Sequence, residues 1–286
     1  MLIALPHPKL LELDGPDAAN FAHAQFSSDI QALAPGHWQW SAWLSPQGRV
    51  RYFFALLRET PERFLLLLRG GEAERLREEL TRFVFRSKVK FRVRADLGLF
   101  GCDEGTVFAQ CGIRPESDVL AIGSDALAFG LPGGARWLLL KASAPVQEFD
   151  DASISAWRLA DIRAGLPELS APLSDRLLPQ WLGLERLRAV SVTKGCYPGQ
   201  EIMARLHFKG GNKRGLYRIE FACDVLPCAG TELTCAGAEA GLVVNAAWSS
   251  GPRAEALATL TGTAASALAL ASSEALRDIH VISRFD

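Results

Sequence analysis

The sequence predicts an α+β protein that ends in a small β-barrel, and three observations support this fold class. Segments with helical spacing of apolar residues and segments of strand-like composition are mixed through the N-terminal and central parts. Residues 88–94 alternate strictly between basic and apolar side chains, which is typical of a half-buried strand. Beyond about residue 215, short apolar segments are separated by Gly230, Gly237 and Gly241, which indicates the turns of a barrel.

The N-terminal part begins with a helix and continues with strands. Residues 17–29 predict an amphipathic helix, because Ala18, Phe21 and Phe26 recur at helical spacing. Strands are then expected over residues 38–44, 50–57 and 63–69, with a turn at 45–48, and a charged helix from 72 to about 83.

The central part predicts a buried strand at residues 137–140 and a helix at 151–164. Residues 189–192, Ala-Val-Ser-Val, are expected to lead as a strand into a turn. A helix is expected to begin at Gln200, with Glu201 in its first turn, where an acid suits the helix dipole. We divide the chain into an N-terminal domain (1–95), a middle domain (96–212) and a C-terminal barrel (213–286), and leave open an exchange of segments between the first two.

Composition predicts an ordinary cytoplasmic globule. The chain has 286 residues, 49% of them hydrophobic, and a net charge of -1, which argues against a disordered or globally nucleic-acid-binding protein. No segment approaches the roughly 20 apolar residues of a membrane helix, and the first residues do not resemble a signal peptide. Six scattered cysteines are expected to be reduced thiols. The spacing of Cys223, Cys228 and Cys235 matches no common ligand pattern, so we predict no metal site.

The most informative segment is the octapeptide 194–201, Lys-Gly-Cys-Tyr-Pro-Gly-Gln-Glu. Two glycines and a proline predict a tight turn that presents one side chain, Cys196. Lys194 and the following helix N-terminus favour the thiolate form of that cysteine. From the residues alone, a functional thiol and a half-buried structural cysteine are about equally supported.

This octapeptide resembles the signature of the YgfZ-type folate-binding proteins, relatives of the glycine-cleavage T-protein. Further segments resemble that family in the same order along the chain: residues 15–18, 25–29, 85–89, 162–167, 178–180, 203–205 and 210–214. The resemblance implies a T-protein-like folate-binding fold, with interleaved N-terminal and middle domains and a small C-terminal β-barrel.

The resemblance also implies tetrahydrofolate or another folate as the cofactor. It places Trp157 on the pterin, and we add Tyr197, Gln200 and Gln180 as candidate cofactor-binding residues. Two departures from the family stand near this site: the N-terminal segment 7–9 has no aromatic residue, and Gly183 replaces a frequent asparagine.

The function that the resemblance implies is support of iron–sulfur cluster assembly or repair, and through iron–sulfur enzymes of tRNA modification. Radical tRNA-modifying enzymes are then the expected partners. Cys196 is the candidate functional thiol, assisted by Lys194, Glu201 and Arg205. One thiol cannot hold a stable cluster, since clusters generally take four ligands, so any cluster contact of Cys196 is expected to be transient.

Two other functions are weighed against this one. Aminomethyl transfer is disfavoured, because residues 48–53 contain no acid where T-protein carries a catalytic carboxylate. A folate-binding regulator without chemistry of its own remains an alternative, and whether the protein is an enzyme is left open. Residues 186–218 contain eight bases and one acid, which suits a folate tail or RNA without choosing between them.

Overall fold

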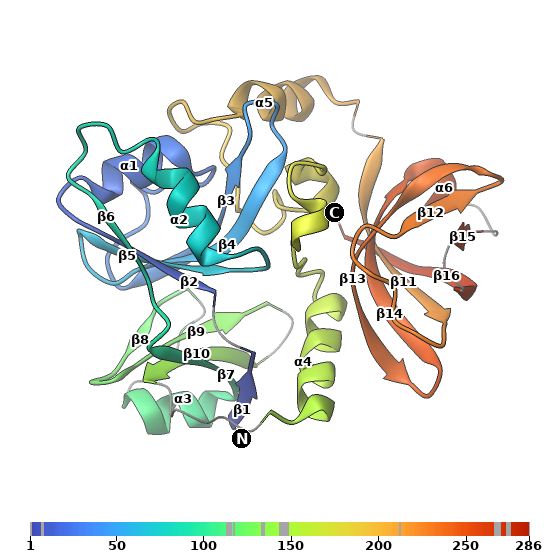
Figure 1. Cartoon of the computed structure of the whole chain (residues 1–286), viewed down its shortest axis with the longest axis horizontal. Coiled ribbons are helices and arrows are strands. Elements are labelled where there is room, and N and C mark those ends of the chain that lie inside the picture. Colours follow the sequence, from blue (N-terminus) through green and yellow to red (C-terminus); the bar gives the residue numbers. More distant parts are fainter. Residues whose placement is uncertain are drawn as a thin grey trace.

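The computed structural model describes residues 2–6, 9–112, 116, 118–132, 135–142, 149–211, 213–265, 270–272 and 276–285. Its strands form three antiparallel sheets, two on one side of a long helix and the third on the other (Figure 1). Of the segments discussed above, His7, Pro8 and Asn212 lie outside the described residues.

The first sheet has the order β3-β4-β5-β2-β6 and contains most of the N-terminal residues. Its strands are β2 (Leu10–Asp14), β3 (His37–Leu44), β4 (Val50–Arg58), β5 (Arg63–Leu68) and β6 (Lys90–Val93). Successive residues of a strand point to opposite faces. Phe53 and Leu57 of β4 therefore join the central core, while Phe54 and Leu56 face the helices. Both faces are buried, which explains the nearly continuous apolar sequence of β4 and β5.

Two helices, α1 (Ala18–Gln25) and α2 (Ala73–Thr81), cover the outer face of this sheet. Phe26, directly after α1, packs edge-on against Phe54 with 5.0 Å between ring centroids. The strand β6 shows the expected alternation, since Phe91 and Val93 pack on this core while Lys90 and Arg92 are exposed.

The second sheet has the order β1-β7-β10-β9-β8. Its strands are β1 (Leu2–Leu5), β7 (Leu97–Cys102), β8 (Ala121–Ile122), β9 (Ala126–Leu131) and β10 (Arg136–Ala142), and α3 (Glu104–Cys111) packs on one face. The first strand of the chain thus pairs with β7, with Leu2 opposite Cys102 and Leu5 opposite Leu99.

The third sheet is the C-terminal β-barrel, in the order β15-β12-β13-β14-β11-β16. Its elements are β11 (Arg214–Ala222), β12 (Glu232–Cys235), β13 (Ala238–Ser250), β14 (Arg253–Thr261), α6 (Gly262–Ala265), β15 (Leu270–Ser272) and β16 (Arg277–Phe285). Helix α4 (Asp151–Arg163) stands between this barrel and the second sheet (Figure 1).

The segment after α4 contains two short 3-10 turns, η1 (Ala171–Leu173) and η2 (Pro179–Leu182), and then α5 (Gln200–Lys209). The prediction of a strand at 189–192 is wrong. The backbone there makes two bonds to Ser27: Ser191 N–H donates to Ser27 O at 2.8 Å, and Ala189 O accepts from Ser27 Oγ at 2.7 Å. It joins no sheet. An apolar run becomes a strand only beside a partner edge, and the nearby edge of β3 is taken by Phe26, which bridges to Trp43. The helix expected from Gln200 is confirmed.

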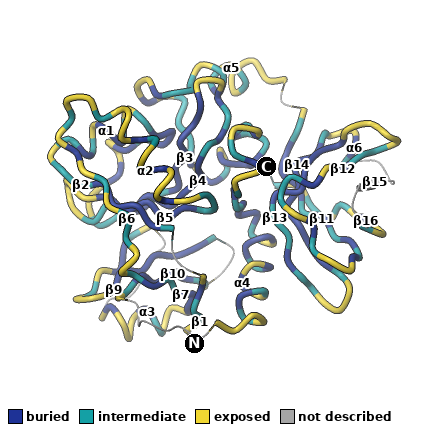
Figure 2. The backbone as a smooth tube through the Cα atoms, in the orientation of Figure 1, coloured by how far each residue is buried: buried dark blue, intermediate teal, exposed yellow. Residues whose placement is uncertain are grey.

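In the part of the chain that the structure describes, no helix is long and apolar enough to cross a membrane. The degree of burial differs between the first sheet and α5. Figure 2 shows the strands of the first sheet as largely buried, whereas α5 is mostly intermediate or exposed.

Candidate functional site

A central cavity of about 130 Å³ lies between the first two sheets and α4, and Trp157 lines it. Trp157 is buried, and its ring packs closely on β7 at Gly101. A Cβ added at Gly101 would lie 2.5 Å from the ring. Leu138 and Ile154 contribute apolar walls, and Glu168 adds a charged group. An aromatic face beside a few polar groups is the composition of a small-molecule site.

A buried ion-pair triad closes one side of this cavity. The Asp161 carboxylate accepts from Arg69 and from Arg136, each at 2.8 Å. The side chain of Asp161 is only 5% exposed. Burial alone would lower the pKa of Arg69, but the carboxylates of Asp161 and Glu168 together more than offset it and the pKa is raised. The triad carries one net positive charge.

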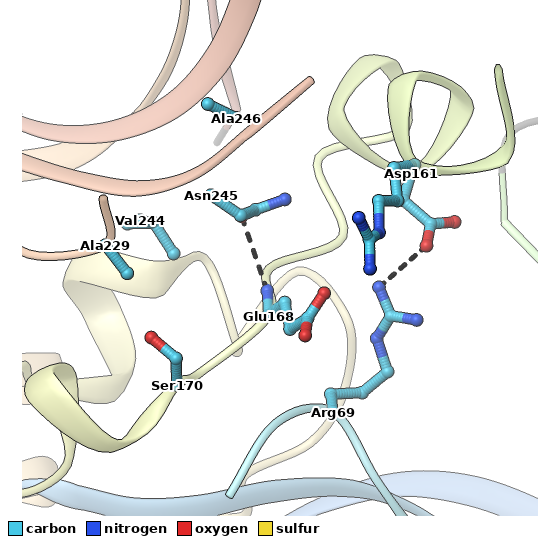
Figure 3. A pocket seen from close by; sticks show the side chains of 9 residues that line it. Arg69, Asp161, Glu168, Ser170, Ala229, Val244, Asn245 and Ala246 are labelled. Atoms are coloured by element: carbon cyan, nitrogen blue, oxygen red, sulfur yellow. Dashed lines mark hydrogen bonds and ion pairs between the residues drawn. The ribbon is translucent and has the colours of Figure 1, made fainter. Parts of the chain in front are cut away.

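A second cavity of about 150 Å³ adjoins the first and shares Arg69, Arg158, Asp161 and Glu168 with it. Figure 3 shows how side chains from α4, from the segment after it and from β13 surround this space, with the Glu168 backbone N–H donating to Asn245 Oδ1 at 3.4 Å. Two polar atoms here, Nε of Arg69 and Oγ of Ser170, are buried and have no hydrogen-bond partner among the described residues. Because the two cavities share lining residues, we treat them as one candidate site, whose joint volume is just below the roughly 300 Å³ at which ligand sites typically begin.

A third cavity, of about 440 Å³, lies on the other side of Arg136. Three tryptophans and three arginines line it: Trp38, Trp40, Trp137, Arg136, Arg186 and Arg188. Its single acidic lining residue is Glu104, so the site favours an aromatic ligand with negative charge.

The octapeptide lies apart from the three cavities, and the Lys194 side chain anchors it to the N-terminal part of the chain. The Lys194 ammonium donates to the carbonyl oxygens of His23, Phe26 and Ser28, the last at 3.0 Å. The amine also lies 4.8 Å from the centroid of the Tyr197 ring. Burial lowers the pKa of Lys194 to about 8, and Asp29 opposes this shift.

The second glycine of the octapeptide allows a backbone contact between two turns. Gly199 has φ +78°, and a Cβ there would lie 2.5 Å from the carbonyl oxygen of Ser45 and 2.7 Å from Cα of Gly48. Only glycine combines this conformation with this approach. The turn at 45–48 between β3 and β4 is therefore packed directly on the start of α5.

Other polar groups of the octapeptide are used to hold its own shape. The Tyr197 hydroxyl donates to Ser191 O at 2.8 Å, and Gln200 Nε2 donates to Lys194 O at 3.0 Å. Gln180 reaches the same helix, with Nε2 3.3 Å from Met203 O. Cys196, in contrast, is exposed. The turn thus presents one thiol to the surroundings.

No family model matches the chain. An uncharacterized protein of Haemophilus influenzae is 32% identical over 217 residues, which cover 75% of this chain and 71% of the relative. The tRNA-modifying protein YgfZ of Edwardsiella ictaluri is 29% identical over 238 residues (78% and 72% covered), and that of Yersinia pestis is 29% identical over 249 residues (81% and 74%). This chain belongs to the YgfZ family.

The fold of this YgfZ-family chain is that of the T-protein. The aminomethyltransferase T of the glycine cleavage system from Bartonella henselae superimposes with a TM-score of 0.72 over 99% of this chain and 84% of that one. Its sequence identity is 16%, so the likeness concerns the fold. The predicted α+β class with a T-protein-like architecture is confirmed.

The structure separates the predicted YgfZ-type site residues into two groups. Trp157 lines the central cavity. Among the described residues that line this cavity and its neighbour, none comes from the octapeptide or from Gln180. Glu201 and Arg205 are exposed on α5. The folate and thiol parts of the predicted site therefore occupy different places.

Two expectations about charge need correction. The Lys194 ammonium has three hydrogens, and three carbonyl oxygens accept them, so it has no donor left for Cys196. The eight bases of 186–218 also do not form one surface around the turn. Arg218, for example, pairs with the buried Glu255 of the barrel at 2.7 Å, and Arg186 donates to Gly165 O at 2.7 Å.

The three cysteines of the C-terminal part differ in exposure. Cys223 is buried, Cys235 is half-buried and Cys228 is exposed. In the described ranges, no three His, Cys, Asp or Glu side chains are grouped so as to hold a metal ion.

Sequence reasoning missed most of the charged cavity residues. Asp161 had a local signal, because it lies one helical turn after Trp157 on a face that is otherwise apolar. Arg69, Arg136 and Glu168 had none, since each lies in a different element and only the tertiary fold brings them together.

Proposed function

We propose that this protein is a cytoplasmic folate-binding factor of tRNA modification that supports iron–sulfur cluster assembly or repair, with Cys196 as its functional thiol. The observation that carries the folate part is the joined cavity beside Trp157, with its unpartnered Arg69 Nε and Ser170 Oγ. The homologues named tRNA-modifying protein YgfZ support the pathway.

The cavity residues match the chemistry of a folate. The flat pterin needs an aromatic neighbour and an acceptor for the N–H groups of its aminopyrimidine edge. Trp157 is the aromatic side chain that lines the cavity, and the guanidinium of Arg136 lies over its ring, 5.0 Å from the centroid. Glu168 is an acceptor in the same cavity. The unpartnered Arg69 N–H and Ser170 hydroxyl suit ring nitrogen and carbonyl groups. In the third cavity, beyond the ion-pair partner Arg136, Arg186 and Arg188 suit the carboxylates of the glutamate tail.

A bound folate supplies a carrier of one-carbon units; the protein residues bind and orient it. Asp161 is poorly suited to proton transfer, because both its oxygens are held by guanidinium groups. The strand β4 contributes no acid near its start, where Arg51 instead pairs with Asp175 at 2.9 Å. Aminomethyl transfer therefore remains disfavoured within this proposal.

Cys196 is exposed and lies outside the folate cavities, so we assign it to the contact with a partner. The partners in this proposal are iron–sulfur proteins such as radical tRNA-modifying enzymes. A single exposed thiolate can take one coordination position on a client cluster and release it again. Arg205, exposed on α5, is available to an anionic group of the client.

The test is a calorimetric titration of tetrahydrofolate, under anaerobic conditions, into wild type, Trp157→Ala, Glu168→Gln and Cys196→Ser. We expect wild type and Cys196→Ser to bind alike, Glu168→Gln to lose roughly 10-fold and Trp157→Ala roughly 100-fold in affinity. Trp157→Phe serves as the matched control that keeps an aromatic face. Absence of binding to wild type would sink the folate assignment.

The thiol assignment is tested separately, by activity of a radical tRNA-modifying enzyme in cells that carry Cys196→Ser in place of wild type. We expect tRNA modification to fall with the protein level unchanged. Full modification would favour the alternative function, a folate-binding regulator without chemistry of its own.

A further inference from the structure

A groove of about 550 Å³ lies on the C-terminal barrel, where β11 begins and β14 passes into α6. Lys213, Arg214 and Arg284 line it with the hydroxyl-bearing Thr261 and Thr263. The backbone of this place is ordered by a hydrogen bond from Gly262 N–H to Lys213 O, at 3.0 Å. The lining contains three bases and no acid, so the groove suits an anion.

The basic surface continues from the groove onto α5. Lys209 ends this helix, and the chain passes from it within four residues to Lys213. Arg205 and Lys209 are both exposed, and no acid occurs in the sequence between Ile202 and Ile219. In Figure 1, α5 leads along the upper edge of the molecule to the start of β11, close to α6. The positively charged surface is therefore long enough to contact more than one anionic group of a ligand.

An aromatic side chain stands in this basic surface. Phe208, between the exposed residues His207 and Lys209, is 72% exposed, although a phenylalanine of this kind normally packs in the core. His207 packs edge-on against it with 5.0 Å between centroids. An exposed aromatic ring next to lysine and arginine is the combination that stacks unpaired bases in single-stranded RNA.

We propose that the groove and the exposed face of α5 form an RNA-binding surface. The basic side chains and the threonine hydroxyls contact the sugar-phosphate backbone of the RNA, and Phe208 stacks on an unpaired nucleobase. An acidic peptide fits less well, because the groove has glycines and hydroxyls where a peptide would need apolar pockets for its anchor side chains. This inference rests on the proposed role in tRNA modification and deepens it, since it makes tRNA a direct ligand.

The partners of the groove residues guide the choice of variants. Arg214 already pairs with Glu239 at 2.6 Å and covers the Trp181 ring, and Arg284 covers the ring of Tyr217. Substituting either would disturb packing as well as charge. Lys209 and Lys213 are exposed, so the double variant Lys209→Gln/Lys213→Gln removes two charges with little effect on the fold.

The experiment measures fluorescence anisotropy of a labelled tRNA transcript at several salt concentrations. We expect wild-type affinity to fall steeply with salt. The double lysine variant should bind roughly 10-fold more weakly at 100 mM salt, with a salt slope smaller by about 1.5. Phe208→Ala should weaken binding to an unpaired tRNA end roughly 10-fold, or about 1.4 kcal/mol, through the loss of stacking, and leave the salt slope unchanged.

The matched control is Arg86→Gln/Lys90→Gln, which removes two exposed bases from the N-terminal domain. It should bind tRNA like wild type. An equal loss of tRNA affinity in the control variant would mean that the general positive charge of the surface, and not the groove, attracts the RNA. If the protein bound polyglutamate in preference to tRNA, an acidic protein would be the better ligand of the groove, and the proposal would be overturned. Tetrahydrofolate titration of the same variants keeps the two proposals apart: tRNA binding can fail while folate binding persists, and the reverse.

Discussion

The central cavity and the octapeptide turn are built in opposite ways. In the cavity, buried polar atoms such as Arg69 Nε and Ser170 Oγ are left without partners beside empty space. In the turn, the side chains of Lys194, Tyr197 and Gln200 make hydrogen bonds within the protein, whereas the Cys196 thiol is exposed. This difference supports our proposal that a small molecule binds in the interior region and that the surface region presents a functional thiol.

The largest expected effect of a single substitution falls on the cavity. Asp161→Ala leaves the guanidinium groups of Arg69 and Arg136 buried without their carboxylate. Removing one partner of such a group typically costs about 3–5 kcal/mol in the free energy of unfolding. Urea denaturation measures this, with Asp161→Asn as the isosteric control that loses the charge and keeps the shape. A loss below about 1 kcal/mol would show that the triad is not the buried network described.

Backbone geometry gives the next largest effect, in the turn. Gly199→Ala places a Cβ 2.5 Å from Ser45 O at a φ of +78°. We expect it to lower the free energy of unfolding by about 2–3 kcal/mol, through strain and the displaced contact between the two turns. The neighbouring glycine offers a matched control.

That control is Gly195→Ala, whose added Cβ would lie 3.9 Å from His23 Nε2, an ordinary van der Waals distance. It should change stability by less than about 0.5 kcal/mol, as an accommodated substitution does. Equal losses in the two glycine variants would mean that the whole turn, and not the contact at Gly199, is intolerant of side chains.

Lys194→Met should destabilise the protein by about 1–3 kcal/mol at pH 7, because three carbonyl oxygens lose their shared donor. The pH dependence is more specific. The folded-state pKa of Lys194, about 8, lies below the ordinary lysine value of 10.5. Between these pH values the unfolded chain binds more protons than the folded one, so the contribution of Lys194 to stability rises with pH.

Denaturation of wild type and Lys194→Met from pH 7 to 10 checks this sign. The difference between them should move in favour of wild type as pH rises. A difference that moves the other way would mean that the carbonyl oxygens hold the charged form more strongly than burial disfavours it.

The smallest structural effect should come from Cys196→Ser. The thiol is exposed and no neighbour depends on it, so stability should change by less than about 0.5 kcal/mol. Thermal unfolding measures this beside Cys223→Ser, where the thiol is buried and a larger loss is expected. A marked loss for Cys196→Ser would make it a structural cysteine and weaken the contrast between the two regions.

Local patterns in the sequence were sufficient for the elements with clear apolar spacing, whereas β1, β2, β7 to β9 and α3 were not predicted. Helix α4 and strands β3 to β5 were predicted within a few residues, because the spacing of their apolar residues is a local property. The strand predicted at 189–192 failed, because forming a strand depends on a distant partner edge. For the same reason Arg69, Arg136 and Asp161 escaped prediction as a site: no local pattern in the sequence indicates that they meet.

The family motif indicated which residues matter around Cys196 more reliably than what they do. Lys194 was expected to act on the thiol, yet its ammonium reaches back to residues 23–28. A lysine two residues away along the chain can point in any direction. Only the position of α1, fixed by the packing of Phe21 and Phe26 on the first sheet, brings those carbonyl oxygens to it.

The pairing of β1 with β7 has a consequence for how the chain is made. The ribosome releases β1 first, but its partner edge emerges only after β2 to β6 have been synthesised. During that interval β1 is an unpaired apolar strand, and it cannot pair with β7 until all strands of the first sheet have been synthesised. Pairings between distant segments slow folding and leave such edges open to other chains. The early segment is therefore a place where chaperone capture or intermolecular pairing is expected during synthesis.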